Sequence, residues 1–410
     1  MNNESGPWAR LIRVPGLFEW RSIREATGPV HKDCAVTPGR TPATWRSWFI
    51  RITPLRYVIL AVLGAAAGVV GGGRGDWDVF VTAGKAMLGR DGMSVYARFP
   101  DVQTGPFSLL IARVLSITPR DGFVASTILC VVLGLVAIRC LERAQHPGRT
   151  TDPQGTQMTI LLGGLVVMFW WAKLGGYGHL DDAIVLTAAA AAVLKIRQGK
   201  SIVAAVLIGL AIATKPWAVI LVPLTFVPVG PLWQRLRAPL IANAIGALFW
   251  LPFFVAEPHT LESMRPTVNI APDSVLQLFG VTNESLPTWM RSAQLLGALG
   301  LATFAIWRGR VGGVLLVAVA FRMLTDPGTW SYYTAGLMLG ALAWDLYETT
   351  SVAPTAILAA AVLLLPPWLI PWPDVRAVTR LVTCLAAIVL VAADKPRLAR
   401  RIPDVVAAPG

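Results

Sequence analysis

The sequence predicts an all-α protein that crosses a membrane many times, and three observations support this fold class. Hydrophobic residues make up 55% of the 410-residue chain and charged residues only 14%, which is too little charge to cover a water-facing surface of that size. The hydrophobic residues are gathered in runs separated by polar segments. Lysine and arginine concentrate in alternate segments, which is typical of cytoplasmic loops. The formal net charge of +13 is therefore explained by basic loops on one side of a membrane, and it does not indicate that the protein binds nucleic acid.

Residues 1–54 are predicted to form a cytoplasmic tail. Basic and aromatic residues occur together there, as in WRSWFIRITPLR, so part of the tail is expected to lie on anionic headgroups of the membrane lipids. About fifty mostly polar residues precede the first apolar run, whereas a cleavable signal peptide has a short basic segment at that place. No such peptide is therefore expected. Because Arg46, Arg51 and Arg56 precede the first span, that span should enter from the cytoplasm.

The apolar runs predict roughly twelve membrane crossings. Several runs are at or below the ~17-residue lower limit of a transmembrane helix, but flanking Trp and Tyr can extend a span through the interface. The crossings are expected at residues 55–72, 123–140, 158–171, 183–194, 202–214, 217–229, 240–255, 295–307, 311–324, 334–346, 353–365 and 381–393.

These crossings form one membrane domain, residues 55–394, followed by a basic cytoplasmic tail at 395–410. The expected location is the plasma membrane, with both termini in the cytoplasm. One apolar segment, 106–117, is shorter than the ~20 residues of a full crossing. Only one net crossing fits between the first outer loop and the basic loop at 139–149. The segment is therefore predicted to be a short re-entrant or surface helix, or a tilted span.

This orientation places the unusual polar clusters on the outer face. They are GDWDVF in a first outer loop at 73–105, GYGHLDD in the loop at 173–182, ATKPWA, NIAPDSVLQLFG in a long loop at 257–290, and DPGTWSYY. The cytoplasmic loops are short, basic and otherwise plain. A protein with this distribution is expected to do its chemistry on the outer side.

Asp76 and Asp78 follow the first span directly. Two carboxylates can serve as a base and its orienting partner, or can hold a divalent cation. Residues two apart diverge on a helix and share a face on an extended strand. The alternative is a solvated loop with a helix N-cap. We favour Asp76 as a catalytic base, because carboxylates at a membrane surface must be solvated, paired or used in chemistry.

The next two clusters offer further polar groups. His179 could donate to a sugar hydroxyl or a phosphate, with Asp181 or Asp182 fixing its tautomer. Alternatively, HLDD caps the following helix, whose positive N-terminus favours acidic residues. Lys215 and Pro216 interrupt an apolar stretch, so Lys215 could bind a phosphate or an acidic partner, or snorkel at the interface beside Trp217.

Arg322 lies at the outer part of a span and needs an anion there, either Asp326 or the phosphate of a ligand. Arg265 in the long outer loop is a second candidate for the same role. Tyr332 and Tyr333 are expected at the interface, with hydroxyls available to bind sugar. In the same outer region, Asp273 and Ser274 are candidates to cap a short helix.

Several familiar motifs are missing from the sequence. It contains no Walker A, GxSxG, HExxH or Rossmann fingerprint. The four cysteines, Cys34, Cys130, Cys140 and Cys384, are scattered without the spacing of a metal site or a disulfide framework. Any reaction is therefore expected to use a pre-activated substrate that arrives from the membrane or from the outer face.

The order of DWDVF, AGKAMLG and Tyr96 after the first span resembles the integral-membrane GT-C glycosyltransferases. The nearest resemblance is to the polyprenyl-phosphate-mannose-dependent alpha-mannosyltransferase group, and it extends over residues 55–393. The usual Tyr-Pro-Pro of that group is replaced here by Thr104, Gly105 and Pro106. In the resemblance, the catalytic Asp of the family matches Asp76, while an Asp at position 78 is not general in the family.

The resemblance implies a donor sugar, mannose or arabinose, on a polyprenyl monophosphate, and an envelope glycolipid or polysaccharide as acceptor. Asp76 would deprotonate the acceptor hydroxyl for an inverting displacement, and Lys215, Arg322 or Arg265 would neutralise the departing phosphate. No cofactor is required on this basis, and a divalent cation is optional. A transporter or lipid flippase and a non-catalytic scaffold remain as alternatives, although a transporter typically places its polar residues near the membrane midplane.

Overall fold

We describe the protein from a computed structural model, which covers residues 52–70, 75–116, 119–145, 153–226, 231–263, 269–281, 288–349, 354–364 and 369–393. All of these residues belong to one unit of the chain, Trp45–Gly410. Within the described residues the regular secondary structure is entirely helical, as predicted. Most of the predicted N-terminal tail, all of the C-terminal tail and Arg265 lie outside the described residues.

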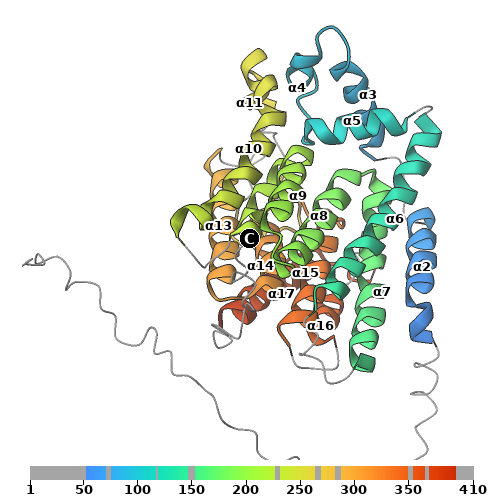
Figure 1. The fold of residues 1–410 in the computed structure, drawn as a ribbon. Coiled ribbons are helices and arrows are strands. Elements are labelled where there is room, and N and C mark those ends of the chain that lie inside the picture. Colours follow the sequence, from blue (N-terminus) through green and yellow to red (C-terminus); the bar gives the residue numbers. More distant parts are fainter. Residues whose placement is uncertain are drawn as a thin grey trace, which may run out of the picture. The chain divides into compact units, whose positions relative to one another are not determined.

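Each predicted crossing coincides with a helix, and the 106–117 segment forms one more (Figure 1). The α-helices are α2 (Arg56–Val70), α3 (Trp77–Met87), α4 (Val95–Arg98), α5 (Pro106–Leu115), α6 (Pro119–Arg143), α7 (Pro153–Tyr177), α8 (Leu180–Arg197), α9 (Ser201–Thr214), α10 (Leu232–Ala256), α11 (Thr260–Ser263), α12 (Val275–Leu278), α13 (Thr288–Trp307), α14 (Val311–Thr325), α15 (Tyr333–Tyr347), α16 (Thr355–Leu363) and α17 (Pro373–Ala393). The 3-10 helices are η2 (Thr53–Leu55), η3 (Gly92–Ser94) and η4 (Pro216–Thr225).

Four of the described helices are long and apolar enough to cross a membrane: Gly122–Arg143 in α6, Gln154–Tyr177 in α7, Leu232–Ala256 in α10 and Pro373–Ala393 in α17. Other apolar helices are shorter. The 14-residue α9, for example, is about 21 Å long at ~1.5 Å per residue, whereas the hydrocarbon core of a bilayer is ~30 Å thick. The protein is therefore all-helical where it is described, with four helices suited to spanning a membrane.

Small residues allow the central helices to pack closely. Most residues of α8 and α14 and all but one residue of α15 are buried. Gly336 and Gly340 form a GxxxG pattern on α15, and a Cβ placed on Gly340 would lie only 2.6 Å from the backbone nitrogen of Leu316 on α14. Without that Cβ, the two backbones can approach each other directly. The α14–α15 pair therefore forms a tight centre, next to which α8 packs.

The described part of the predicted first outer loop is folded into short helices. It contains α3, η3 and α4, and α5 follows it. Figure 1 shows α5 lying across one end of the longer helices, and it packs against α3, α6 and α9. Its ten residues span about 15 Å, which is half of a bilayer core. Of the structures predicted for 106–117, a surface or re-entrant helix fits α5, and a tilted span does not.

Two predicted boundaries differ from the structure. The external loop expected at 173–182 is reduced, because α7 continues to Tyr177 and α8 begins at Leu180. Buried Leu174 explains the extension, since it packs into the core. In its described part, the crossing expected at 217–229 is a 3-10 helix, and the internal Pro223 lacks the N–H group that an α-helix would use there. At ~2.0 Å per residue, its ten residues reach only about 20 Å.

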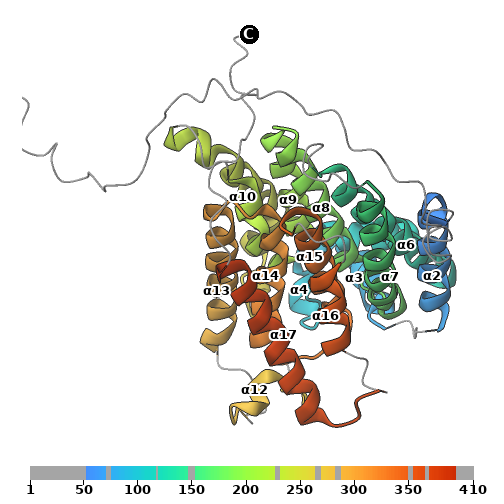
Figure 2. The ribbon, with the colours of Figure 1, turned by 90° about the horizontal axis from the view of Figure 1, so that it is seen from below.

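The described part of the predicted long outer loop at 257–290 is attached to the last described helix. Figure 2 shows α12 beside α17, and these two helices are in contact. Ser274 caps α12 by accepting a hydrogen bond from the backbone N–H of Gln277, which confirms the predicted cap. Asp273 does not cap the helix. Its carboxylate instead accepts hydrogen bonds from Arg376 Nε at 3.0 Å and from the Thr329 hydroxyl, and so ties this loop to α17 and to the α14–α15 loop.

Candidate functional site

Backbone contacts hold the first polar segment against the end of α7. Gly75 has a φ of +47°, which favours glycine, and a Cβ at this position would lie 2.2 Å from the Tyr177 carbonyl oxygen. The next residue, Asp76, donates its backbone N–H to that same carbonyl at 3.1 Å. The close approach of Gly75 therefore places Asp76 beside the turn between α7 and α8.

The carboxylate of Asp76 lies between solvent and a buried histidine. Asp76 occupies the N-cap position of α3, but its side chain makes no capping hydrogen bond. Its side chain is 56% exposed, and Oδ2 lies 3.3 Å from Nε2 of His179. Trp77 and Phe80 are buried and anchor α3 to the core. Asp76 is thus held in place by its neighbours, while its carboxylate remains accessible from the surface.

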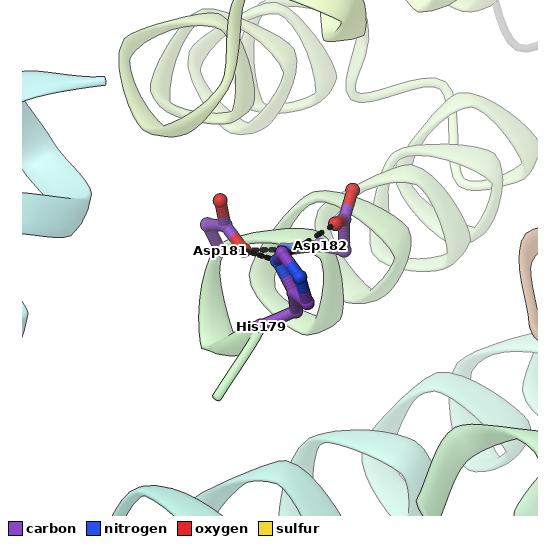
Figure 3. Close-up of side chains that lie close together, drawn as sticks. All are labelled: His179, Asp181 and Asp182. Carbon is purple, nitrogen blue, oxygen red and sulfur yellow. Dashed lines mark hydrogen bonds and ion pairs between the residues drawn. The ribbon is translucent and has the colours of Figure 1, made fainter. Parts of the chain in front are cut away.

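His179 lies at the N-cap position of α8, and its imidazole is surrounded by polar and aromatic groups. Nδ1 lies 3.5 Å from Oδ1 of Asp181 and 3.7 Å from Oδ2 of Asp182 (Figure 3). The Tyr332 ring packs on the imidazole, with centroids 3.8 Å apart. Asp181 and Asp182 occupy the first turn of α8, where the helix dipole favours acidic residues. The two acids of HLDD therefore lie at the helix terminus as one reading expects, although the His179 side chain makes no capping hydrogen bond, and a role of His179 towards a sugar or a phosphate stays a prediction.

The pKa of His179 is raised above its usual value, although two effects oppose this. Burial lowers the pKa, and the ammonium group of Lys215 lowers it further. The carboxylates of Asp181 and Asp76 favour the imidazolium and outweigh both effects. The histidine is therefore suited to carry positive charge next to Asp76.

Lys215 joins a third loop to this cluster. Its Nζ lies 2.6 Å from Oδ2 of Asp182 and 2.8 Å from Oδ2 of Asp181, although the contact with Asp181 is not aligned as a hydrogen bond. Trp217 Nε1 donates to the other oxygen of Asp182 at 2.8 Å. Asp181, Asp182 and Lys215 are buried together with His179, whereas Trp217 is only partly buried. We call His179, Asp181, Asp182 and Lys215 the buried charge cluster.

The segment that replaces Tyr-Pro-Pro holds Lys215 in place from the side of the first outer loop. Gly105 N–H donates to the Thr214 carbonyl at 2.7 Å, and the Thr104 hydroxyl donates to the same oxygen at 3.2 Å. Tyr96 donates its hydroxyl to the Thr104 carbonyl at 3.1 Å. The first outer loop is thereby attached to the residue directly before Lys215.

Arg322 lies close to the cluster, with aromatic rings on two sides. Its guanidinium carbon is 4.6 Å from the centroid of the Trp217 ring and 4.3 Å from that of the Tyr333 ring. Its predicted partner Asp326 is 3.7 Å from Nε. Arg322, Asp182 and both of these rings line a cavity of about 10 Å³, roughly the space of one water molecule.

Asp326 is buried and has several partners besides Arg322. Oδ2 lies 3.4 Å from Arg291 and 3.4 Å from Gln294, and Oδ1 accepts the N–H of Gly328 at 3.0 Å. This carboxylate therefore joins the start of α13 to the loop between α14 and α15.

A patch of aromatic rings continues from Tyr332 to the surface. Trp330 is stacked near Tyr332 at 6.2 Å and is half exposed, and Tyr177 lies 6.0 Å from Tyr332. Tyr333 packs edge to face on Tyr332 at 4.7 Å. Aromatic faces beside carboxylates could contact the apolar faces of sugar rings.

The spacing of His179, Asp181 and Asp182 could suit a metal ion, since one ligand atom from each lies within 4.8 Å of the others. The Lys215 ammonium, however, lies within 2.8 Å of both carboxylates and already supplies a cation there. A divalent ion at this place would meet strong repulsion from Lys215. These side chains therefore fit a resident metal poorly while Lys215 is charged.

The structure brings together Asp76, His179, Asp181, Asp182, Lys215, Tyr332, Tyr333, Arg322 and Asp326 from loops far apart in the sequence. It does not bring Asp78 into the cluster: Asp78 is exposed in the first turn of α3, as expected for residues two apart on a helix.

Sequence reasoning assigned Trp217 to the membrane interface and missed its contacts with Asp182 and Arg322. Its position two residues after Lys215 was the available signal. Arg291 and Gln294 were also missed, because their relation to Asp326 depends on how α13 packs against α14.

The chain matches no family model, no curated protein and no solved structure. The chemistry of the site is therefore inferred from its own residues and geometry.

Proposed function

We propose that the protein is a membrane glycosyltransferase of the GT-C type, which transfers a sugar such as mannose from a polyprenyl-phosphate donor to an envelope glycolipid or polysaccharide on the outer face. The observation that carries the proposal is the half-exposed carboxylate of Asp76, held 3.3 Å from buried His179. A catalytic base needs a fixed position and access to its substrate, and Asp76 has both.

In the proposed reaction, Asp76 accepts the proton of the acceptor hydroxyl. The acceptor oxygen then forms a bond to the anomeric carbon, while the bond from that carbon to the phosphate oxygen breaks. The electron pair leaves with the polyprenyl phosphate, and the configuration at the anomeric carbon is inverted. His179 orients Asp76 through the Nε2–Oδ2 contact, and Tyr332 holds the imidazole in place.

Among the cations expected to stabilise the departing phosphate, Arg322 is the better candidate. Lys215 is engaged by two carboxylates, at 2.6 and 2.8 Å. Arg322 has a longer contact of 3.7 Å with Asp326 and lines the small cavity beside Asp182. The Arg322 guanidinium can therefore bind a phosphate oxygen at a smaller loss of existing contacts than the Lys215 ammonium can.

The proposed topology has roughly twelve crossings in the plasma membrane. It is supported by the one-to-one agreement between the predicted crossings and the helices, and by the meeting of alternate loops at the site. Helices such as α9 and η4 are short for a crossing, so the membrane around them would have to be thin or the helices would need support from neighbours.

The test is transfer of labelled sugar from polyprenyl-phosphate-linked donors in membranes that contain the full-length protein. Asp76→Asn should lower transfer by about 10²- to 10⁴-fold, the usual range for removal of a general base. The matched control is Asp78→Asn, which removes the same charge two residues away on the exposed side of α3 and should retain transfer. Equal transfer by wild type and Asp76→Asn would rule out the proposed base.

The buried charge cluster also supports a second candidate, a transporter or lipid flippase, because buried ionisable residues in membrane proteins often lie on ion or substrate pathways. Proteoliposomes distinguish the two. Transport of a labelled lipid-linked sugar across the bilayer, without transfer from mannose or arabinose donors to any acceptor, would favour the transporter.

A further inference from the structure

A groove between α2 and α6 lies outside the candidate site. It has a volume of about 510 Å³ and is lined by Pro54, Arg56 and Tyr57 on one side and by Val132, Leu135, Val136 and Arg139 on the other. We call it the α2–α6 groove. Arg56 is the first residue of α2, whereas Asp76 comes after the far end of that helix. The groove and the candidate site are thus associated with opposite ends of α2.

The wall contributed by α6 is apolar and exposed. Val124, Ile128, Val132 and Val136 recur at every fourth position, so they form one ridge along the helix, and between 42% and 60% of each residue is accessible. This helix contains a segment suited to crossing a membrane, Gly122–Arg143. In a bilayer such a ridge faces acyl chains, and its last member, Val136, borders the groove.

The end of the groove is cationic. Glu142 accepts hydrogen bonds from Arg56, Arg139 and Tyr57, so two guanidinium groups share one carboxylate. The three ionised side chains leave one positive charge in excess. The Arg139 side chain is 43% exposed, whereas that of Arg56 is only 15% exposed. The excess charge is therefore most accessible at Arg139, at the mouth of an apolar groove.

We propose that the α2–α6 groove binds one anionic phospholipid. The acyl chains lie along the ridge of α6, and the phosphodiester accepts hydrogen bonds from Arg139 and receives the field of Arg56. The site matches such a lipid in two ways. Along α6, the apolar ridge that would contact the acyl chains is followed by Arg139, whose positive charge would meet the headgroup. This site is separate from the proposed transfer reaction and does not depend on it.

The experiment uses the full-length protein, purified in a neutral detergent and supplied with phosphatidylglycerol or phosphatidylcholine of the same acyl composition. Native mass spectrometry counts the retained lipid, and the melting temperature is measured in parallel. Wild type should retain phosphatidylglycerol in preference. Arg139→Gln should weaken that retention about fivefold, the usual effect of one basic residue at a lipid surface.

The matched control is Arg143→Gln, which removes an exposed positive charge one turn later on α6, outside the groove lining. It should retain the preference. A second variant, Val136→Trp, fills the groove without changing charge and should lower phosphatidylglycerol retention while the protein still melts cooperatively. Equal retention of both lipids by wild type, or equal losses from Arg139→Gln and Arg143→Gln, would overturn the proposal.

Discussion

Lys215 shows how burial changes what a charged residue can do. In the sequence it stands beside Pro216 in an apolar stretch, where binding to a phosphate, pairing with an acidic partner and snorkelling are all open. In the structure its ammonium lies within 2.8 Å of Asp181 and Asp182, with little exposure to solvent. Its charge is therefore used within the protein, where it offsets two carboxylates that also face His179.

The first prediction concerns this pairing. Lys215→Met should destabilise the protein by about 3–5 kcal/mol, because removal of one partner leaves uncompensated buried charge. The double variant Lys215→Met, Asp182→Asn should recover part of the loss. Lys200→Met serves as the control, since Lys200 is exposed at the start of α9. Denaturation of the purified protein measures the effect, and equal stability of Lys215→Met and Lys200→Met would contradict the assigned pairing.

Asp76 and Asp78 were indistinguishable as two acids beside a membrane segment, and helical geometry separates them. Asp76 precedes α3 and reaches His179, whereas Asp78 is on the exposed side of the first turn. The decisive contact depends on residues about a hundred positions apart. The sequence favours Asp76 as an acid at the membrane surface and through a family resemblance, and the contact with His179 adds a structural reason for that preference.

At the scale of elements, helix length and close packing matter most. The α9–η4 hairpin carries Lys215 at its turn, and the turn is held by Thr104 and Gly105. The centre of the helix assembly is the α14–α15 pair, in which Gly340 lies directly against the backbone of α14. Because Arg322 lies in the last turn of α14 and Tyr333 is the first residue of α15, the packing of this pair also sets the distance between these two site residues.

The second prediction tests that packing. Gly340→Ala should lower the melting temperature, because the new methyl group would clash with the Leu316 backbone, and overpacking typically costs about 1–3 kcal/mol. Gly300→Ala on α13 is the control, since nothing lies within 4 Å of its added Cβ. That change should be neutral or stabilising by up to ~1 kcal/mol, the propensity difference between Gly and Ala. A similar response at both positions would show that the α14–α15 contact is not close-packed.

At the scale of the whole molecule, alternate loops meet at one end of the helices. The loops before α3, between α7 and α8, between α9 and η4, and between α14 and α15 contribute to one site. In the other set of loops, residues 198–200 between α8 and α9 are exposed and include Lys200. A membrane crossed by these helices would have one set of loops on each of its two sides.

The third prediction is a labelling pattern. In a variant without native cysteines, Arg90→Cys in the first outer loop should react with a membrane-impermeant maleimide on intact cells. Gln198→Cys, between α8 and α9, should react only after the membrane is permeabilised. Both positions are exposed, so accessibility to solvent alone does not distinguish them. Labelling of both from the same side would exclude the proposed topology.

The helical class and the approximate position of each apolar helix could be predicted from the sequence alone. Composition and periodicity are local properties, so they can be read without knowing which helices touch. Local signals were weaker at the ends of elements, as α7 shows: a loop was expected from residue 173, whereas the helix continues to Tyr177 with Leu174 buried in the core.

Which polar residues form one site could not be predicted from the sequence, because it depends on how the helices pack. The contacts of Asp76 with His179, of Lys215 with Asp181 and Asp182, and of Arg322 with Trp217 and Tyr333 join elements that are distant in the sequence. Each depends on how helices pack, which is set by close approaches such as Gly75 to Tyr177 and Gly340 to Leu316. Such contacts leave no periodic signal, because complementarity between distant surfaces produces them.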